Sequence, residues 1–227
     1  MIDVEEAGMR KEQIGTSTLF LCDCMDLMAT LPDKSIDLCI CDPPYGIGDH
    51  GIRNYKEDGK WKDKHGTKIK IWDTPPDASY FNELFRVSKY QIIWGGNYFN
   101  LPPCRNFIIW YKPKMAGEGF SMAQAEYAWT NIIGNSRVFT FSQFEKDRIH
   151  NTQKPVALYK WLLSRYAKQG DKILDTHFGS GSIAIACNEM GFNLTASEID
   201  EDYYNAALKR IKDANRQGDL FRETVNN

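Results

Sequence analysis

The chain has 227 residues, 42% of them hydrophobic, and carries a formal net charge of −2. This length suffices for one well-buried α/β domain without disulfide or metal staples, and neither low complexity nor a long internal repeat is visible. The small net charge excludes a global basic field for binding nucleic acid, so any contact with DNA requires a local basic patch.

The first residues include Asp3, Glu5 and Glu6 instead of the basic start of a signal peptide. The longest apolar runs fall far short of the roughly 20 residues that a membrane-spanning helix requires. We therefore expect one cytoplasmic domain, residues 1–227, with no membrane contact.

Short apolar runs alternate with amphipathic stretches along the chain. The predicted strands span Thr18–Leu21, Asp37–Cys41, Tyr90–Trp94, Asn106–Trp110, Glu126–Trp129, Lys172–Asp175 and Asn193–Ser197. The predicted helices span Met25–Thr30, Ala78–Val87, Val156–Ala167, Ser182–Met190 and Glu201–Asn215. This alternation predicts an α/β fold with a mixed, mostly parallel seven-stranded sheet and helices on both faces. Pro155 is expected in the first turn of its helix, and residues 216–227 are expected to form a frayed tail.

Two pairs of cysteines, Cys22/Cys24 and Cys39/Cys41, have a spacing that suggests a zinc site. Each pair falls within or at the end of a predicted strand, where residues two apart share a face. Small buried cysteines explain the pairs equally well. We expect no metal.

The tetrapeptide Asp42-Pro43-Pro44-Tyr45 directly follows the apolar run Ile36–Cys41, which is typical of a buried strand. An exocyclic amino group on a base is a poor nucleophile because its lone pair is delocalised into the ring. The Asp42 carboxylate can accept one of its N–H groups, and the Pro43 carbonyl, aimed by two consecutive prolines, can accept the other. Tyr45 can stack on the base once the base has left the duplex. The tetrapeptide therefore predicts a catalytic site for an amino group.

A basic segment, residues 46–72, begins directly after this tetrapeptide. Three aromatic residues, Tyr55, Trp61 and Trp72, are interleaved with its cations. The cations are Arg53, Lys56, Lys60, Lys62, Lys64, Lys68 and Lys70. A charged segment is often only a solvated loop, but its position beside the predicted site favours a DNA-binding loop.

A glycine-rich turn follows the strand that ends at Asp175. Gly179 and Gly181 allow a tight turn and close approach of a ligand, and Ser182 is expected to cap the next helix. Glu198 follows 19 residues after Gly179, a spacing that places a carboxylate on a ribose diol. A Gly-Lys-Ser/Thr sequence is missing from this turn, which excludes a P-loop, so a cofactor without phosphates, S-adenosylmethionine, fits better. Together with the tetrapeptide, the turn predicts methyl transfer to a base nitrogen.

These motifs resemble those of the DNA N6-adenine/N4-cytosine amino-methyltransferase family. Asp42–Tyr45 is similar to motif IV of that family, Asn151–Pro155 to motif X and Asp175–Ser182 to motif I. The order IV, X, I resembles the circularly permuted β class, and the similarity spans Phe20–Ile211. The resemblance implies a Rossmann-like class I methyltransferase fold, double-stranded DNA as the substrate, and a restriction-modification context in a bacterium or phage.

The resemblance also implies roles for individual residues. Asp23 and Cys24 lie in a segment similar to the one that approaches the adenine of the cofactor, Glu198 is expected to hold the ribose, and Lys154 to lie near the methionine carboxylate. The expected catalytic residues are Asp42, Pro43, Pro44 and Tyr45. The expected cofactor-binding residues are Asp23, Cys24, Asp42, Lys154, Asp175, Phe178, Gly179, Gly181, Ser182 and Glu198.

The chain departs from the family in two places. The family usually has Asp-Pro-Phe before its Gly-x-Gly, whereas this chain has Asp175-Thr176-His177-Phe178, so aromatic packing on the cofactor is expected from Phe178, with His177 as a spacer. The target-recognition region, residues 131–151, is reduced. Sequence recognition must then rest on short loops, 46–72 and 132–149, or on a second subunit in a homodimer.

Four alternatives remain open. N4-cytosine methylation is the nearest alternative to the expected methylation of adenine N6. Relatives with Ser at the Asp42 position favour cytosine, so Asp42 favours adenine. RNA and protein-glutamine methyltransferases usually carry Asn-Pro-Pro in unpermuted order. Carbon-5 cytosine methylation needs a nucleophilic Cys after a Pro, and Pro103-Cys104 supplies one without supporting context. The last alternative is an inactive DNA-binding accessory protein.

Overall fold

The computed structural model describes residues 9–47, 74–113, 123–142, 149 and 153–225. Within them the strands form one nine-stranded sheet in the order β1-β2-β9-β8-β3-β4-β6-β5-β7. The strands are β1 Arg10–Ile14, β2 Ser17–Leu21, β3 Ile36–Cys41, β4 Ser88–Trp94, β5 Phe107–Tyr111, β6 Ala125–Thr130, β7 Arg137–Thr140, β8 Lys172–Asp175 and β9 Asn193–Glu198. The helices are α1 Cys24–Thr30, α2 Ala78–Val87, α3 Val156–Tyr166, α4 Ser182–Met190 and α5 Glu201–Val225, with a 3-10 turn η2 at Gly96–Tyr98.

Five strands in the middle of the sheet are parallel: β2, β9, β8, β3 and β4. β6 is antiparallel to both of its neighbours, β4 and β5, and β1 is antiparallel to β2. The apolar sequence of β3 is buried on both faces, as a central parallel strand requires. The α/β fold with a mixed, mostly parallel sheet is therefore confirmed.

The predicted number of seven strands is wrong, because the described residues add β1 and β7. Both lie at the edges of the sheet. Their side chains are largely exposed, so neither strand has the buried apolar residues that mark strands such as β3.

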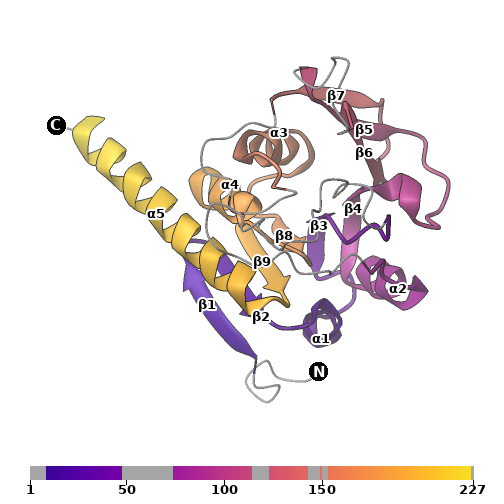
Figure 1. Ribbon diagram of the computed structural model, residues 1–227, viewed down its shortest axis with the longest axis horizontal. Coiled ribbons are helices and arrows are strands. Elements are labelled where there is room, and N and C mark those ends of the chain that lie inside the picture. The colour runs from indigo at the N-terminus through magenta and orange to yellow at the C-terminus, as the bar shows by residue number, and fades with distance from the viewer. Residues whose placement is uncertain (1–8, 48–73, 114–122, 143–148, 150–152, 226–227) are drawn as a thin grey trace, which may run out of the picture.

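Helices cover both faces of the sheet (Figure 1). On one face, α3, α4 and α5 contribute Leu158, Ile183 and Tyr204 to a single buried cluster. On the other face, α1 and α2 contribute Leu27 and Leu84 to a second cluster. The sheet with its two apolar faces is the core of the molecule.

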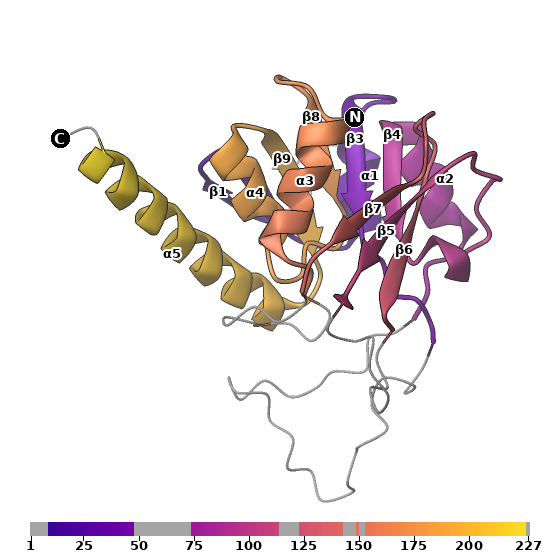
Figure 2. The same ribbon diagram turned by 90° about the horizontal axis from the view of Figure 1, so that it is seen from above.

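Two helix ends differ from the prediction. Pro155 is the N-cap of α3, one residue before the first turn, with an extended ψ of 145°. The predicted frayed tail, residues 216–227, instead continues α5 as far as Val225, and the end of this helix projects away from the sheet (Figure 2).

The described part of the chain contains no helix that combines the length and the apolar character needed to cross a membrane. Within the same residues, no three His, Cys, Asp or Glu side chains come together as a possible metal site. Cys39 and Cys41 are buried on β3, in the core beneath α1 and α2.

Candidate active site

Four neighbouring parallel strands, β2, β9, β8 and β3, end at one edge of the sheet, which we call the carboxyl edge. The ends of parallel strands are where ligands bind in open α/β sheets. Each of these strands ends at, or is followed within two residues by, an acidic side chain. In the order of the strands these residues are Asp23, Glu198, Asp175 and Asp42. The fold thus brings the two predicted motifs together on adjacent strands.

Both oxygens of the Asp42 carboxylate have a hydrogen-bond donor. The Tyr45 hydroxyl donates to Oδ1 at 2.5 Å, and the Lys154 ammonium is paired with Oδ2. The side chain of Asp42 is 17% exposed, and Pro43 beside it is buried. Two donors from separate segments therefore fix the orientation of this carboxylate at the end of β3.

The Tyr45 ring lies in an aromatic group at the end of β4. It stacks on Tyr98 with centroids 5.0 Å apart and meets Phe99 edge-on at 6.1 Å. Gly95, with φ 68°, makes this packing possible, because a Cβ there would lie 2.2 Å from the Tyr45 ring. Burial raises the pKa of Tyr45 well above its ordinary value, so its hydroxyl stays protonated and donates to Asp42.

The charge on Lys154 is shared between two carboxylates. Besides Asp42, its ammonium pairs with Oε2 of Glu126 at 3.2 Å, and Oε1 of Glu126 pairs with Lys112 at 2.6 Å. Burial opposes the charge on Lys154, but the two carboxylates raise its pKa above the ordinary value. Burial likewise opposes the charge on Glu126, yet Lys154 and Lys112 hold the pKa of Glu126 below its ordinary value. Lys154, predicted near the cofactor's carboxylate, therefore lies against Asp42 in the structure.

The glycine-rich turn lies beside these groups, between β8 and α4. The Gly179 N–H donates to Oε2 of Glu198 at 3.1 Å, while Oε1 accepts from the Asp200 N–H at 3.0 Å. Gly181 has φ 74°, and a Cβ there would lie 2.7 Å from Ile211 on α5. The turn therefore needs glycine both for its backbone shape and for the packing of α5, and it brings Glu198 against the backbone of Gly179.

Asp175, at the end of β8, is almost completely buried. Its Oδ1 accepts the His177 N–H at 3.0 Å. Burial nevertheless raises the pKa of Asp175 to about 8, and the nearby charges of Asp42 and Glu198 add to the rise. At neutral pH this carboxyl is mostly protonated, so its part in the site is to shape the turn and not to supply charge.

This pKa gives a testable pH dependence of stability. Between the ordinary pKa of 3.8 and the folded value of about 8, the folded protein holds a proton that the unfolded chain has lost, so Asp175 lowers stability as pH rises through that window. Asp175→Asn removes this effect and keeps an acceptor for the His177 N–H. We expect thermal melts to show the variant gaining stability relative to the wild type from about pH 4 to about pH 8. A constant difference across this range would contradict the raised pKa.

His177 is half-buried next to this carboxyl. Its Nδ1 lies 2.9 Å from Thr176 Oγ1, and its ring meets the Tyr80 ring edge-on at 5.6 Å. Burial lowers the pKa of His177 to about 4, so the imidazole is neutral at pH 7. These contacts support the prediction of a spacer.

Residues 124–209 match the N6/N4 methyltransferase family, described as DNA methylase. The type II methyltransferase M.HinfI of Haemophilus influenzae is 26% identical over 90% of this chain and 71% of its own length. M.HpaI of Haemophilus parainfluenzae is 25% identical over 81% of this chain and 70% of its own. The chain is therefore similar to the N6/N4 family of DNA methyltransferases over residues 124–209, and to type II methyltransferases over most of its length.

Two solved structures from methyltransferases share the fold. M1.HpyAVI in complex with SAM has a TM-score of 0.54 at 20% identity, over 86% of this chain and 99% of that one. The cytosine-N4-specific PvuII DNA methyltransferase has a TM-score of 0.55 at 12% identity, over 90% and 95%. The sheet described above is therefore the class I methyltransferase fold.

Three residues expected to contact the cofactor of this family have other partners in the structure. Phe178 is buried in the core, with its ring edge-on to Tyr204 of α5, instead of at the carboxyl edge. Ser182 is buried too, and its Oγ accepts from Arg210 at 2.9 Å. Gly181, and not Ser182, is the N-cap of α4. The contacts of Phe178 and Ser182 join the turn to α5.

The other two residues of the cofactor prediction lie at the end of β2. Asp23 is exposed and is the N-cap of α1, accepting the Met25 N–H at 2.8 Å. Cys24, the first residue of α1, is half-buried, and burial raises the pKa of its thiol to about 12. The backbone N–H of Cys22 donates to the Glu198 carbonyl at 3.1 Å. This hydrogen bond holds the end of β2 beside Glu198, the residue predicted to bind the ribose.

Sequence reasoning missed four residues of this site: Glu126 and Lys112, which complete the charge contacts, and Tyr98 and Phe99, which pack on Tyr45. One signal was available for Glu126. Glu126 lies on the same face of β6 as Ala128 and Thr130, which are both buried. A charged side chain on this face therefore requires an oppositely charged partner.

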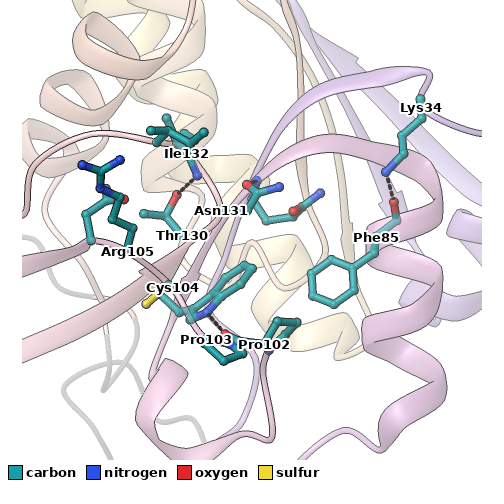
Figure 3. Close-up of a pocket in the computed structure, with 13 residues that line it drawn as sticks. Lys34, Phe85, Pro102, Pro103, Cys104, Arg105, Thr130, Asn131 and Ile132 are labelled. Carbon is teal, nitrogen blue, oxygen red and sulfur yellow. Dashed lines mark hydrogen bonds between the residues drawn. The ribbon is translucent and has the colours of Figure 1, made fainter.

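A cavity of about 430 Å³ lies between α2, the end of β6 and the segment before β5 (Figure 3). It contains none of the predicted site residues. Phe85, Pro102 and Trp129 supply its apolar wall, and Cys104 also lines it. The cysteine of the carbon-5 alternative, Cys104, therefore lines a cavity that none of the residues of the Asp42 site contacts.

Some predicted features lie outside the described residues. They include residues 48–72 of the predicted DNA-binding loop, residues 143–148 and 150–151 of the reduced target-recognition region, and Asn151 and Thr152 of the motif X segment.

Proposed function

We propose that the protein transfers the methyl group of S-adenosylmethionine to the N6 amino group of an adenine flipped out of double-stranded DNA. The observation that carries this proposal is the placement of Asp42–Tyr45 and of the glycine-rich turn at the ends of adjacent parallel strands, β3 and β8. An amino group held by the first motif would then face a cofactor held by the second. The neighbouring strand supplies Glu198 at the same edge.

The residues at the carboxyl edge fit S-adenosylmethionine. Asp23 and Glu198 supply carboxylates at this edge, which suit a sulfonium cation with ribose hydroxyls and disfavour a polyphosphate. Glu198 would hold the ribose beside the Gly179 backbone, and Asp23 with Cys24 would border the adenine. When bound, the cofactor supplies an electrophilic methyl group.

The catalytic work then falls to groups that hold the target amine. Each carboxylate oxygen accepts up to two hydrogen bonds, so Asp42 can accept an amine N–H while Tyr45 and Lys154 stay in place. The Pro43 carbonyl would accept the second N–H, directing the lone pair toward the methyl group. Tyr45, already stacked on Tyr98, would offer its ring to the base. Orientation and electrostatic alignment thereby supply the rate.

The choice of adenine rests on Asp42, because relatives with Ser at this position favour cytosine. N4-cytosine transfer is the second candidate, since the cytosine-N4-specific PvuII enzyme shares the fold. In either case we propose that the basic segment 46–72 contacts DNA phosphates, that a second copy of the chain can complete recognition, and that the enzyme acts in a restriction-modification setting.

An assay with labelled S-adenosylmethionine and unmethylated bacterial genomic DNA tests the proposal. The product DNA is digested to nucleosides, and mass spectrometry should identify N6-methyladenine. N4-methylcytosine would select the second candidate. Cofactor binding without any transfer would leave the accessory alternative.

Glu198→Gln should weaken cofactor binding without unfolding the protein. The amide keeps an acceptor oxygen for the Gly179 N–H but loses the charge-assisted bonds to a ribose diol, which contribute about 1.5–3 kcal/mol, or about 10–100-fold in Kd. Isothermal calorimetry with S-adenosylmethionine measures the change. Glu189→Gln, an exposed carboxylate on α4, is the control. Equal affinities for wild type and Glu198→Gln would remove Glu198 from the site.

A further inference from the structure

Four side chains form a continuous chain of alternating charge beside the proposed site: Asp42, Lys154, Glu126 and Lys112. We call them the charge chain. Each member contacts the next, with Lys154 paired to both Asp42 and Glu126, and Lys112 paired to Glu126. They come from four separate segments: the end of β3, the residue before Pro155, β6, and the end of β5. The fold has therefore brought the four residues of the charge chain together from distant parts of the sequence.

The two cations of the charge chain cannot turn toward water. The side chains of Lys154 and Lys112 are 2% and 4% exposed. Each ammonium lies over a buried indole, Lys154 at 5.2 Å from the Trp94 centroid and Lys112 at 4.8 Å from that of Trp110. Their positions are therefore decided by the carboxylates they contact.

Glu126 is the member of the charge chain that lies within a strand of the sheet. It lies on β6, between β4 and β5, and its backbone is directly opposite Trp110. Both of its carboxylate oxygens are occupied, Oε1 by Lys112 and Oε2 by Lys154. With both oxygens bonded and its strand paired on each side, the Glu126 carboxylate has a fixed position from which to hold Lys154.

We propose that Glu126 and Lys112 are positioning residues for Asp42, acting through Lys154. Lys112 fixes the Glu126 carboxylate, Glu126 fixes the Lys154 ammonium, and Lys154 fixes Oδ2 of Asp42, while Tyr45 fixes Oδ1. The remaining lone pairs of Asp42 then point in one direction, toward the target amine. This inference rests on the proposed function, because it assumes that Asp42 accepts an N–H of that amine.

The competing explanation is that these charges merely neutralise one another in a buried place. Removing either Glu126 or Lys112 alone disturbs both roles, since it leaves an uncompensated charge. Removing both restores charge balance and leaves the Asp42–Lys154 pair intact. The double variant Glu126→Gln/Lys112→Gln therefore separates positioning from neutralisation.

The experiment compares wild type with Glu126→Gln, Lys112→Gln and the double variant in the labelled-cofactor assay on unmethylated genomic DNA. We expect the double variant to melt close to the wild-type temperature but to lose about 10–100-fold in kcat, the scale of a misplaced reacting group, with KM for cofactor and DNA within about threefold. Lys160→Gln/Glu189→Gln, which removes an exposed pair between α3 and α4, is the matched control and should keep wild-type kcat.

The outcomes distinguish this inference from the proposed function. If the wild type transfers methyl groups and the double variant has wild-type kcat, the positioning role is wrong and the proposed function stands. If the wild type shows no transfer at all, the proposed function fails, and this inference fails with it. A single variant that does not fold changes nothing, because the charge-balanced double variant carries the test.

Discussion

Asp42→Asn should lower kcat for methyl transfer by about 1,000-fold, the upper scale for removal of one preorganised polar group. The substitution keeps the size of the side chain but replaces one acceptor oxygen with an amide NH₂. Lys154 is a donor, so it will take the remaining amide oxygen and leave the NH₂ toward the substrate. A donor cannot accept the N–H of the target amine, so the lone pair is no longer directed at the methyl group.

Cofactor affinity should stay within about threefold in the same variant, because Asp42 acts on the amine and Glu198 on the cofactor. Single-turnover rates with labelled cofactor and calorimetric Kd values give the two readouts. Asp213→Asn, an exposed carboxylate on α5 paired with Lys209, is the control and should match wild type in both. Transfer by Asp42→Asn at near the wild-type rate would sink the catalytic assignment.

Strong local patterns explain why most of the fold was predictable. The seven predicted strands and five predicted helices are all present with small shifts of their ends, except that the last helix continues from Asn215 to Val225. Buried strands such as β3 are continuous apolar runs, and α2 buries Tyr80, Phe81, Leu84 and Val87 on one face. The two strands that the sequence did not predict, β1 and β7, form because they pair with β2 and β5, and not because of their own hydrophobic pattern. β1 has the polar sequence Arg10–Ile14, and β7 has four largely exposed residues, so only their neighbours in the sheet make them strands.

The site was predictable where a motif directly follows a strand, as at Asp42, Asp175 and Glu198, because topology alone brings these ends to one edge. Glu126 and Lys112 were not predictable in the same way. Their contact requires the register that sets Trp110 opposite Glu126, and this register is a property of the folded sheet. The contacts of Phe178 with Tyr204 and of Ser182 with Arg210 likewise depend on the packing of α5 against the turn, which is a property of the folded chain.

Lys154→Met should destabilise the folded protein by about 3–5 kcal/mol, the cost of breaking a buried ion pair from one side. Methionine fills a similar volume above Trp94, so the loss is mainly one of charge. Without the ammonium, the Asp42 and Glu126 carboxylates lie near each other with Lys112 as the remaining cation of the charge chain. Chemical denaturation at neutral pH measures the free energy of unfolding.

The pH dependence of this loss gives a second, independent check. In the wild type the pKa of Glu126 is held below its ordinary value of 4.5, so its contribution to stability is present above that value and is lost as pH falls through the folded pKa. In Lys154→Met one of the two cations that lower the pKa of Glu126 is gone, while burial still raises this pKa. Protonation of Glu126 at low pH therefore removes an uncompensated negative charge from the variant. The difference in free energy of unfolding between wild type and variant should therefore shrink as pH falls from about 7 to about 4.

Lys160→Met, which breaks the exposed pair with Glu189, is the control and should cost no more than about 1 kcal/mol at any pH. If Lys154→Met were as mild as this control, Lys154 would be a replaceable core side chain, and Asp42 would have to be oriented by Tyr45 alone.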